Sequence, residues 1–251
     1  MVSDKPGRSR KMLAISMVAG VILVCLLAVA ILLVASNYGH QSQPNTLNLT
    51  FAGTGSVSGD QIEATKNVLQ KRFDAIGYGA SVSSEFDNSG RALITVHYGN
   101  GSADRITSIA TMPGNFEMRI QTSGNQSEHI LYGGEVKSAS ISLHDGQTSA
   151  SVPWVVSMAL SPTGAEAFRQ ACMAQNVTSD QENHPIIMLL DGNVVYSAPL
   201  SRELAEEIAN HTIDSLVMST SPGDEGRELA EKVCASISGG ELLLPLEVSG
   251  T

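Results

Sequence analysis

The stretch LLDGNVVYSAPL, residues 189–200, sets an Asp-Gly pair between two apolar runs. Glycine accepts the positive φ that a two-residue hairpin turn requires, and both runs are rich in residues that favour strands. A catalytic aspartate would need an acidic or basic partner nearby, and the closest downstream charge is Arg202, beyond the second run. The sequence therefore predicts a β-hairpin in which Asp191 and Gly192 turn the chain.

Upstream of this hairpin, strand and helix patterns alternate. Every second residue of TLNLTFA, residues 46–52, is apolar, which is typical of a half-buried strand, whereas the apolar residues of 60–76 follow helical spacing. The patterns predict strands at 46–52, 80–86, 91–98 and 115–121, and helices at 60–76 and 102–111. Their order, βαββαβ, predicts a ferredoxin-like base at residues 46–121, with helices on one antiparallel sheet.

A second α+β unit, a head subdomain at residues 122–242, is predicted after the base. The segment TSGNQSEHILYGG, residues 122–134, has three glycines and no regular period. Thr122, Ser123 and Gly124 are therefore the expected hinge between the two units. The later patterns predict strands at 139–145, 152–160 and 213–219, helices at 162–175, 204–208 and 229–237, and a strand in 243–251 that returns toward the base. The expected fold class is α+β throughout.

The N-terminal segment combines a basic tail with a long uncharged run. Residues 1–12 carry four basic side chains and one acidic one, and residues 13–35 carry no charge. As a helix, the run would extend ~35 Å, which exceeds the ~30 Å hydrocarbon layer of a bilayer. Because basic residues mark the cytoplasmic side, we expect a cell-membrane protein with a single transmembrane helix, a cytoplasmic tail, a linker at 36–45 and an extracytoplasmic body. A cleaved signal peptide is the alternative, since residues 34–36 form a tolerable cleavage site.

The charge of the chain excludes nucleic acid as a partner. The net charge is −10, with the acidic excess after the linker, so a phosphate backbone would be repelled. Cys172 and Cys234 lie on predicted helices, where they could form a disulfide, although the apolar residues around them favour buried thiols. Five Asn-x-Ser/Thr sequons follow the uncharged run and are candidate glycosylation sites: Asn48, Asn100, Asn125, Asn176 and Asn210.

The sequence contains no strong pattern for catalysis, metal binding or cofactor binding. The glycines of residues 52–60 follow a strand and precede a helix, but their spacing is G-x-G-x-x-x-G rather than that of a dinucleotide-binding turn. Ser58 and Gln61 instead fit a capping box. The two nearest histidines, His129 and His144, are too far apart to share one turn of a helix. We therefore expect no cofactor, no metal and no enzymatic activity, with a triad assembled from distant residues left open.

Several segments resemble, in order, the first extracytoplasmic domain of the SecD family, membrane subunits of the Sec protein-export machinery. The resemblance covers the chain from about residue 46 and includes the single preceding membrane helix. It implies a ferredoxin-like base near the membrane, a mobile head, and contact with polypeptide emerging from the translocon. The implied partners are the Sec translocon and an unfolded preprotein. The segments that carry the resemblance are VLQKRFDAIG (68–77), GGEVKSASIS (133–142), MALSPTGAEAF (158–168), IIMLLDGNVVYSAPL (186–200) and GRELAEKVCASISGGELLLPLEV (226–248).

The sequence departs from the family in one respect. Family members continue, after the strand that resembles ELLLPLEV, into five more membrane helices that carry proton-conducting charges, whereas this sequence ends at Thr251. We therefore expect a non-catalytic domain that acts passively or with a separately encoded membrane subunit. One alternative is an anchored binding module for a small solute or surface ligand, which predicts an apolar pocket with convergent polar groups. A hydrolase with a dispersed active site is the other.

Overall fold

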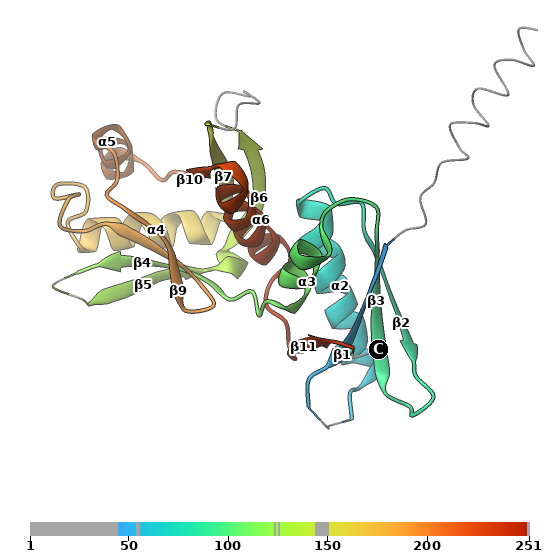
Figure 1. Cartoon of the computed structure of the whole chain (residues 1–251). Coiled ribbons are helices and arrows are strands. Elements are labelled where there is room, and N and C mark those ends of the chain that lie inside the picture. Colours follow the sequence, from blue (N-terminus) through green and yellow to red (C-terminus); the bar gives the residue numbers. More distant parts are fainter. Residues whose placement is uncertain (1–44, 54–55, 123, 125, 144–150, 250–251) are drawn as a thin grey trace, which may run out of the picture. The chain divides into compact units, whose positions relative to one another are not determined.

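The computed structural model describes residues 45–53, 56–122, 124, 126–143 and 151–249 (Figure 1). These residues form helices and antiparallel sheets, which confirms the mixed α and β class. The basic tail, the membrane helix expected at 13–35 and most of the linker lie outside the described residues. Within the described ranges, no helix is both long enough and apolar enough to span a bilayer.

The first sheet has the strand order β11-β1-β3-β2, and all neighbouring strands in it are antiparallel. Helices α2 and α3 lie on one face of it (Figure 1). The predicted capping box opens α2, because the Gln61 N–H donates to Ser58 Oγ and the Ser58 N–H donates to Gln61 Oε1. The elements are β1 (Asn45–Phe51), α2 (Gly59–Ala75), β2 (Ser81–Phe86), β3 (Ala92–Tyr98), α3 (Ala103–Thr111) and β11 (Leu246–Val248).

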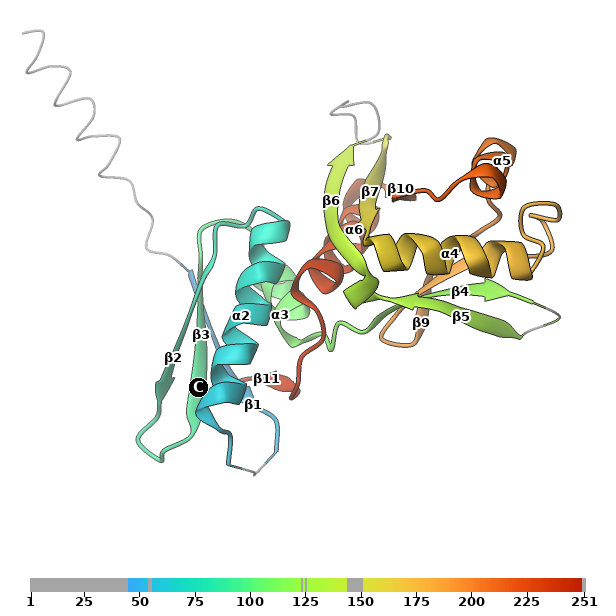
Figure 2. The same ribbon diagram turned by 180° about the vertical axis from the view of Figure 1, so that it is seen from behind.

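The remaining described strands form two further sheets. The sheet β5-β4-β8-β9 packs one face against α4, and the sheet β10-β7-β6 packs against α6 (Figure 2). A 3₁₀ turn at Gly133–Glu135 joins β5 to β6. The elements are β4 (Phe116–Gln121), β5 (Ser127–Tyr132), β6 (Val136–Leu143), β7 (Pro153–Leu160), α4 (Pro162–Ala174), β8 (Ile186–Leu190), β9 (Asn193–Ala198), α5 (Arg202–Asn210), β10 (Ser215–Pro222) and α6 (Gly223–Gly239).

Two expectations about strands are wrong. The strand at 115–121 was placed in the base, but β4 pairs with β5 and β8, and the position beside β1 is taken by β11. Local periodicity identifies a strand without identifying its partner. The lost period of 122–134 predicts an irregular segment, yet this segment contains β5. An irregular register between β4 and β5 buries the consecutive residues Ile130 and Leu131, which hides the period of two.

The described residues bury two apolar cores. The first core lies between the first sheet and helices α2 and α3, and Leu49 and Phe73 are fully buried in it. The second core joins the other two sheets to α4, α5 and α6, and it contains the fully buried Phe168. Helix α6 contributes Ala235 to the first core and Val233 to the second. It is therefore the element that both cores share.

The hinge expected at Thr122, Ser123 and Gly124 does not lie between these cores. Thr122 and Gly124 lie in the connection between the paired strands β4 and β5, and the Thr122 N–H donates to the Gln126 carbonyl oxygen at 2.9 Å. Ser123 lies outside the described residues. The chain instead passes between the cores near residues 112–115 and again near 239–242. The glycine and the lost period of 122–124 therefore reflect a hairpin turn within one sheet.

Cys172 and Cys234 are buried thiols, so the disulfide alternative is wrong. Cys172 lies on α4 in the second core, and Cys234 lies on α6, where its thiol approaches the Ala75 carbonyl oxygen at 3.8 Å. Burial raises the pKa of Cys172 to about 12 and the pKa of Cys234 to about 11. Because the thiolate is the reactive form, both side chains are protected by protonation as well as by packing.

Both thiols should therefore resist alkylation in the folded chain. In a Cys25→Ser background, we expect a maleimide reagent at pH 7.5 to label neither cysteine before urea is added, and to label both in urea. The measurement is intact mass after timed labelling. Labelling of the native chain at the rate of a free thiol would contradict the burial of these groups.

Candidate functional site

An apolar groove lies between β9 and β10, beside α5. It has a volume of about 260 Å³ and is formed by side chains of α4, β8, β9, α5 and β10, among them Phe168, Met188, Tyr196, Leu204 and Leu216. Phe168, Met188 and Leu216 are buried members of the second core, and Tyr196 and Leu204 are partly buried against it. The groove therefore has an apolar floor that continues into the core.

The groove offers few polar side-chain groups. No Asp, Glu, Lys, Arg or His lines it, and its side-chain polar atoms are the hydroxyls of Tyr196 and Ser201. Ser201 is already the N-cap of α5, where its Oγ accepts the Leu204 N–H at 3.2 Å. Sites for small solutes combine apolar walls with several convergent polar groups and usually enclose ~300–1,000 Å³. This groove is therefore suited to apolar side chains rather than to a small polar solute.

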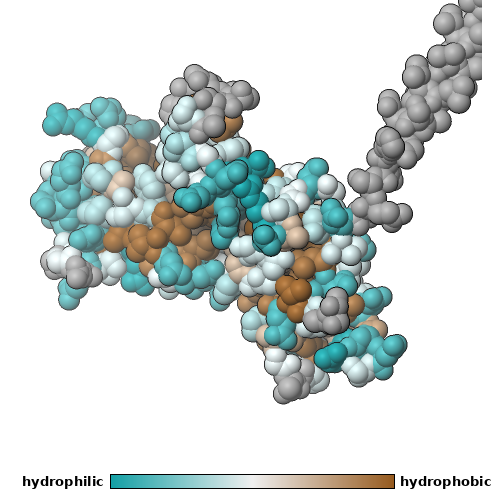
Figure 3. Space-filling view, in the orientation of Figure 1, coloured by the Kyte–Doolittle hydropathy of each residue, from teal (hydrophilic) through white to brown (hydrophobic). Residues whose placement is uncertain are grey.

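Apolar side chains also gather over β9 on the face of its sheet that is opposite α4 (Figure 3). Val194 is 62% exposed there, and the side chains of Ile187 and Leu189 lie half-buried beside it. Arg119 borders this surface and pairs with Glu117 at 3.0 Å. The sheet therefore exposes apolar side chains on this face as well as on the face that forms the groove.

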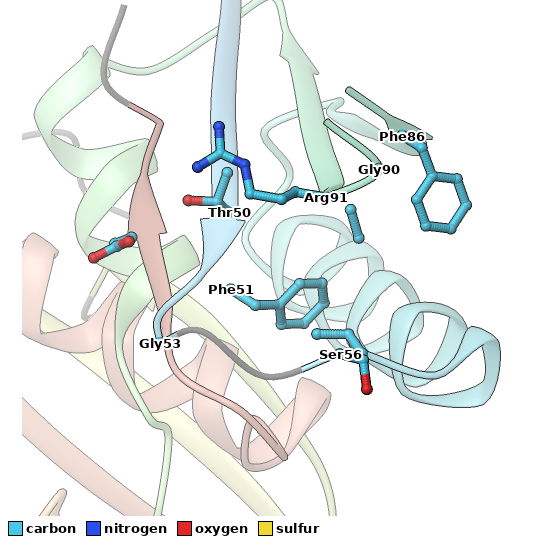
Figure 4. A pocket seen from close by; sticks show the side chains of 10 residues that line it. Thr50, Phe51, Gly53, Ser56, Phe86, Gly90 and Arg91 are labelled. Atoms are coloured by element: carbon cyan, nitrogen blue, oxygen red, sulfur yellow. The ribbon is translucent and has the colours of Figure 1, made fainter. Parts of the chain in front are cut away.

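A larger hollow, of about 390 Å³, lies at one end of the first sheet, near Phe51 and Glu247 (Figure 4). Its labelled side chains do not converge, because Arg91 and Phe86 extend to opposite sides of Phe51. Arg91 is already paired, with its Nε 2.9 Å from Asp87 Oδ2. The side chains of this hollow therefore do not form the convergent polar set that is typical of a binding site.

Arg72 forms a polar centre where the two cores meet. Its guanidinium is fully buried and donates to four carbonyl oxygens that lie in or just after the last turns of α3 and α6. Helix ends leave such carbonyls without partners and carry partial negative charge, which a cation stabilises. Arg72 thus caps two helices at once and connects α2 to both chain crossings. The acceptors are Ile109 at 3.0 Å, Met112 at 2.7 Å, Pro113 at 2.8 Å and Gly240 at 2.7 Å.

Glycines make room for this arginine. A Cβ at Gly114 would lie 2.1 Å from Arg72 Nη2, and one at Gly239 would lie 2.4 Å from Arg72 Cγ and 2.7 Å from the Val68 carbonyl oxygen. Gly114 also has a φ of +88°, which favours glycine. Burial lowers the pKa of Arg72 to about 10, and the nearby Asp191 carboxylate partly opposes this shift. The side chain is still a cation at neutral pH.

Asp191 is part of the same junction. Asp191 and Gly192 form the two-residue turn between β8 and β9, with φ values of +53° and +78°. In addition, Asp191 Oδ1 accepts the N–H groups of Gly114 at 2.7 Å and Asn115 at 2.8 Å. The carboxylate therefore fixes the crossing segment to the hairpin, beside Arg72. Sequence reasoning identified the turn and missed this contact.

A second polar cluster joins α6 to the first core. Glu231 is 3% exposed; its two oxygens accept the Tyr78 hydroxyl and Arg227 Nε, each at 2.7 Å. Arg105 of α3 lies 3.9 Å from the same carboxylate. Burial and the Glu231 carboxylate both raise the pKa of Tyr78 above its ordinary value of 10.0. The Tyr78 hydroxyl is therefore held as a donor by its surroundings.

This shift predicts a loss of stability at high pH. Because the folded pKa of Tyr78 lies above the unfolded one, its contribution is complete below about pH 10 and falls as the pH rises through the folded pKa. We expect Tyr78→Phe to weaken this dependence of the urea midpoint between pH 8 and pH 10.5, whereas Tyr132→Phe, at a side chain that is 54% exposed, leaves it unchanged. Equal slopes in Tyr78→Phe and the parent chain would contradict the assignment.

The candidate glycosylation sites are spread over the described surface. Asn48, Asn100, Asn176 and Asn210 are exposed, and Asn125 lies outside the described residues. Asn48 lies within β1, and its Oδ1 accepts the Thr95 hydroxyl at 3.1 Å. Use of the sequons stays a prediction. Among the described residues, no group of three or more His, Cys, Asp or Glu side chains is placed to hold a metal ion.

Comparison with known proteins identifies the family to which the chain is related. No family model matches the chain. Over 203 residues it is 31% identical to the protein-export membrane protein SecD of Methanolacinia petrolearia, and the match covers 78% of this chain and 39% of that protein. The chain is a relative of SecD. The resemblance identified from the sequence segments is thereby confirmed, and the chain spans about two fifths of the length of that SecD.

Solved SecDF structures have the same fold. A crystal structure of SecDF in a super-membrane-facing form matches with a TM-score of 0.59 at 16% identity, over 93% of this chain and 34% of that one. A second structure, of a SecDF membrane component that enhances protein export, matches with a TM-score of 0.52 at 18% identity, over 82% of this chain and 99% of that one. The SecD relative described here therefore has the fold of a SecDF domain.

Proposed function

We propose that this SecD relative assists protein export by holding segments of unfolded polypeptide in the groove between β9 and β10. The observation that carries the proposal is an uncharged apolar groove in a chain related to an export protein. An unfolded chain exposes the apolar side chains that such a surface buries, each worth ~1.5–3 kcal/mol when fully buried. No chemical reaction is required, because binding the emerging segment opposes its backward movement.

The two cores would divide this work. We propose that the first core is the base near the membrane and the second core the head that contacts substrate, with residues 13–35 as the anchor and residues 1–12 in the cytoplasm. The Sec translocon and a separately encoded membrane subunit are the proposed partners. The alternative, a binding module for a small solute, is disfavoured by the few polar groups of the groove.

Site-specific crosslinking tests this proposal. A photoreactive amino acid would replace Val217, which lines the groove and is 59% exposed, in cells that are exporting a stalled preprotein. The matched control replaces Phe86, an apolar residue that is 65% exposed on the first sheet. We expect crosslinks to the preprotein from position 217 and few from position 86. Equal crosslinking from both positions, or none from 217, would reject the groove as the contact.

A further inference from the structure

The edge of β9 beside the groove has no strand partner among the described residues. β9 is the last strand of the sheet β5-β4-β8-β9, and β10 is the last strand of the sheet on the other side of the groove. Neither strand contains a charged residue. Edge strands of soluble proteins are usually protected by charged side chains, by proline or by a covering element, because their free N–H and C=O groups pair readily with another chain.

The side-chain pattern favours β9 over β10 as the pairing edge, because alternate residues of β9 line the groove, whereas the lining residues of β10, Leu216 and Val217, are consecutive. The register between β9 and β8 is irregular near the turn, but it is regular at Tyr196, Ser197 and Ala198. Tyr196 and Ala198 line the groove, whereas Ser197 between them is exposed. A strand added beside this stretch would follow the same alternation, with every second side chain over the groove. The buried ring of Phe168 lies in the wall that those side chains would meet.

The groove cannot satisfy a polypeptide backbone by itself. Its one uncommitted polar side-chain group is the Tyr196 hydroxyl, because Ser201 already caps α5. A buried backbone amide without a hydrogen bond costs roughly 1–3 kcal/mol. A polypeptide that inserts apolar side chains here therefore needs main-chain partners close by, and the free edge of β9 supplies them.

We infer that an extended, uncharged polypeptide segment binds by adding a strand to β9, with alternate apolar side chains in the groove. This inference rests on the proposed contact with unfolded polypeptide and specifies its mode. Main-chain pairing does not depend on side-chain identity. Binding in this mode would therefore accept many sequences, provided that alternate residues are apolar and the segment is extended.

Backbone methylation of a probe peptide tests the inference. The probe is a seven-residue fluorescent peptide of alternating valine and serine, bound to the full chain in detergent micelles. Two further peptides carry N-methyl groups, one on all the valines and the other on all the serines. Successive N–H groups of a strand point to opposite sides, so one series blocks pairing with β9 and the other does not. We expect one series to lose at least tenfold in affinity while the other changes less than twofold.

Hydrogen exchange identifies the edge that pairs. The unmethylated peptide should slow amide exchange in residues 193–198 of β9, with little change in residues 215–219 of β10. Binding that is insensitive to both methylated series, or protection confined to β10, would overturn strand addition while leaving polypeptide contact intact. Absence of binding by every peptide would instead reject the proposed function along with the mode.

Discussion

Replacing Arg72 with methionine should lower the free energy of unfolding by about 3–5 kcal/mol, because four carbonyl oxygens lose a donor and two of them, those of Ile109 and Met112, are buried. Methionine fills the space of the aliphatic part of the arginine side chain and donates no hydrogen bond. The loss of stability therefore measures the contribution of the guanidinium. Lysine keeps the charge but lacks the planar guanidinium that reaches four acceptors. The free energy of unfolding of Arg72→Lys should therefore lie between those of Arg72→Met and the parent chain. Urea denaturation of the full chain in detergent, followed by fluorescence of the single tryptophan, Trp154, measures these differences.

Arg91→Met is the matched control. Arg91 pairs with the Asp87 carboxylate, but its side chain is 75% exposed, and such pairs contribute at most ~1 kcal/mol. We expect little change in this variant. If Arg72→Met were as mild as Arg91→Met, the carbonyls at the junction would have other donors, and Arg72 would not be the group that joins the two cores.

Replacing Asp191 with glycine should lower the free energy of unfolding by about 2–3 kcal/mol, although glycine suits a positive φ better than aspartate does. The reason is the carboxylate, whose Oδ1 accepts both N–H groups of the crossing segment. Asp191→Asn keeps an acceptor in the same place and tolerates the turn, so it should cost about 1 kcal/mol or less. The same urea titration compares the two variants.

The two Asp191 variants separate two roles for the residue. If Asp191 served the turn alone, glycine would be neutral or slightly stabilising, and asparagine would be neutral. If Asp191 holds the crossing segment, Asp191→Gly should lose clearly more stability than Asp191→Asn. A stable Asp191→Gly chain would therefore return Asp191 to the simple role of a turn residue, which was our interpretation of the sequence.

Local patterns predicted individual elements well where each element follows one clear period. The capping box at Ser58 and Gln61 begins α2 as predicted, and the hairpin between β8 and β9 turns at Asp191 and Gly192. The strand β5 was missed because its irregular register interrupts the alternation. Arg72 was visible in the sequence as a cation on the apolar stripe of a helix, three residues after Leu69, yet only burial shows that it is a structural group.

The sequence by itself determined the class of fold, most strands and helices, the turn at Asp191 and Gly192, and the family, since each of these follows from neighbouring residues or from the order of segments. The tertiary structure alone decided that β11 rather than β4 lies beside β1, that Arg72 caps two helices, and that a groove opens between β9 and β10. These features join residues far apart in the chain. Strand pairing and shared burial depend on the packing of the whole chain, and a local period carries no information about them.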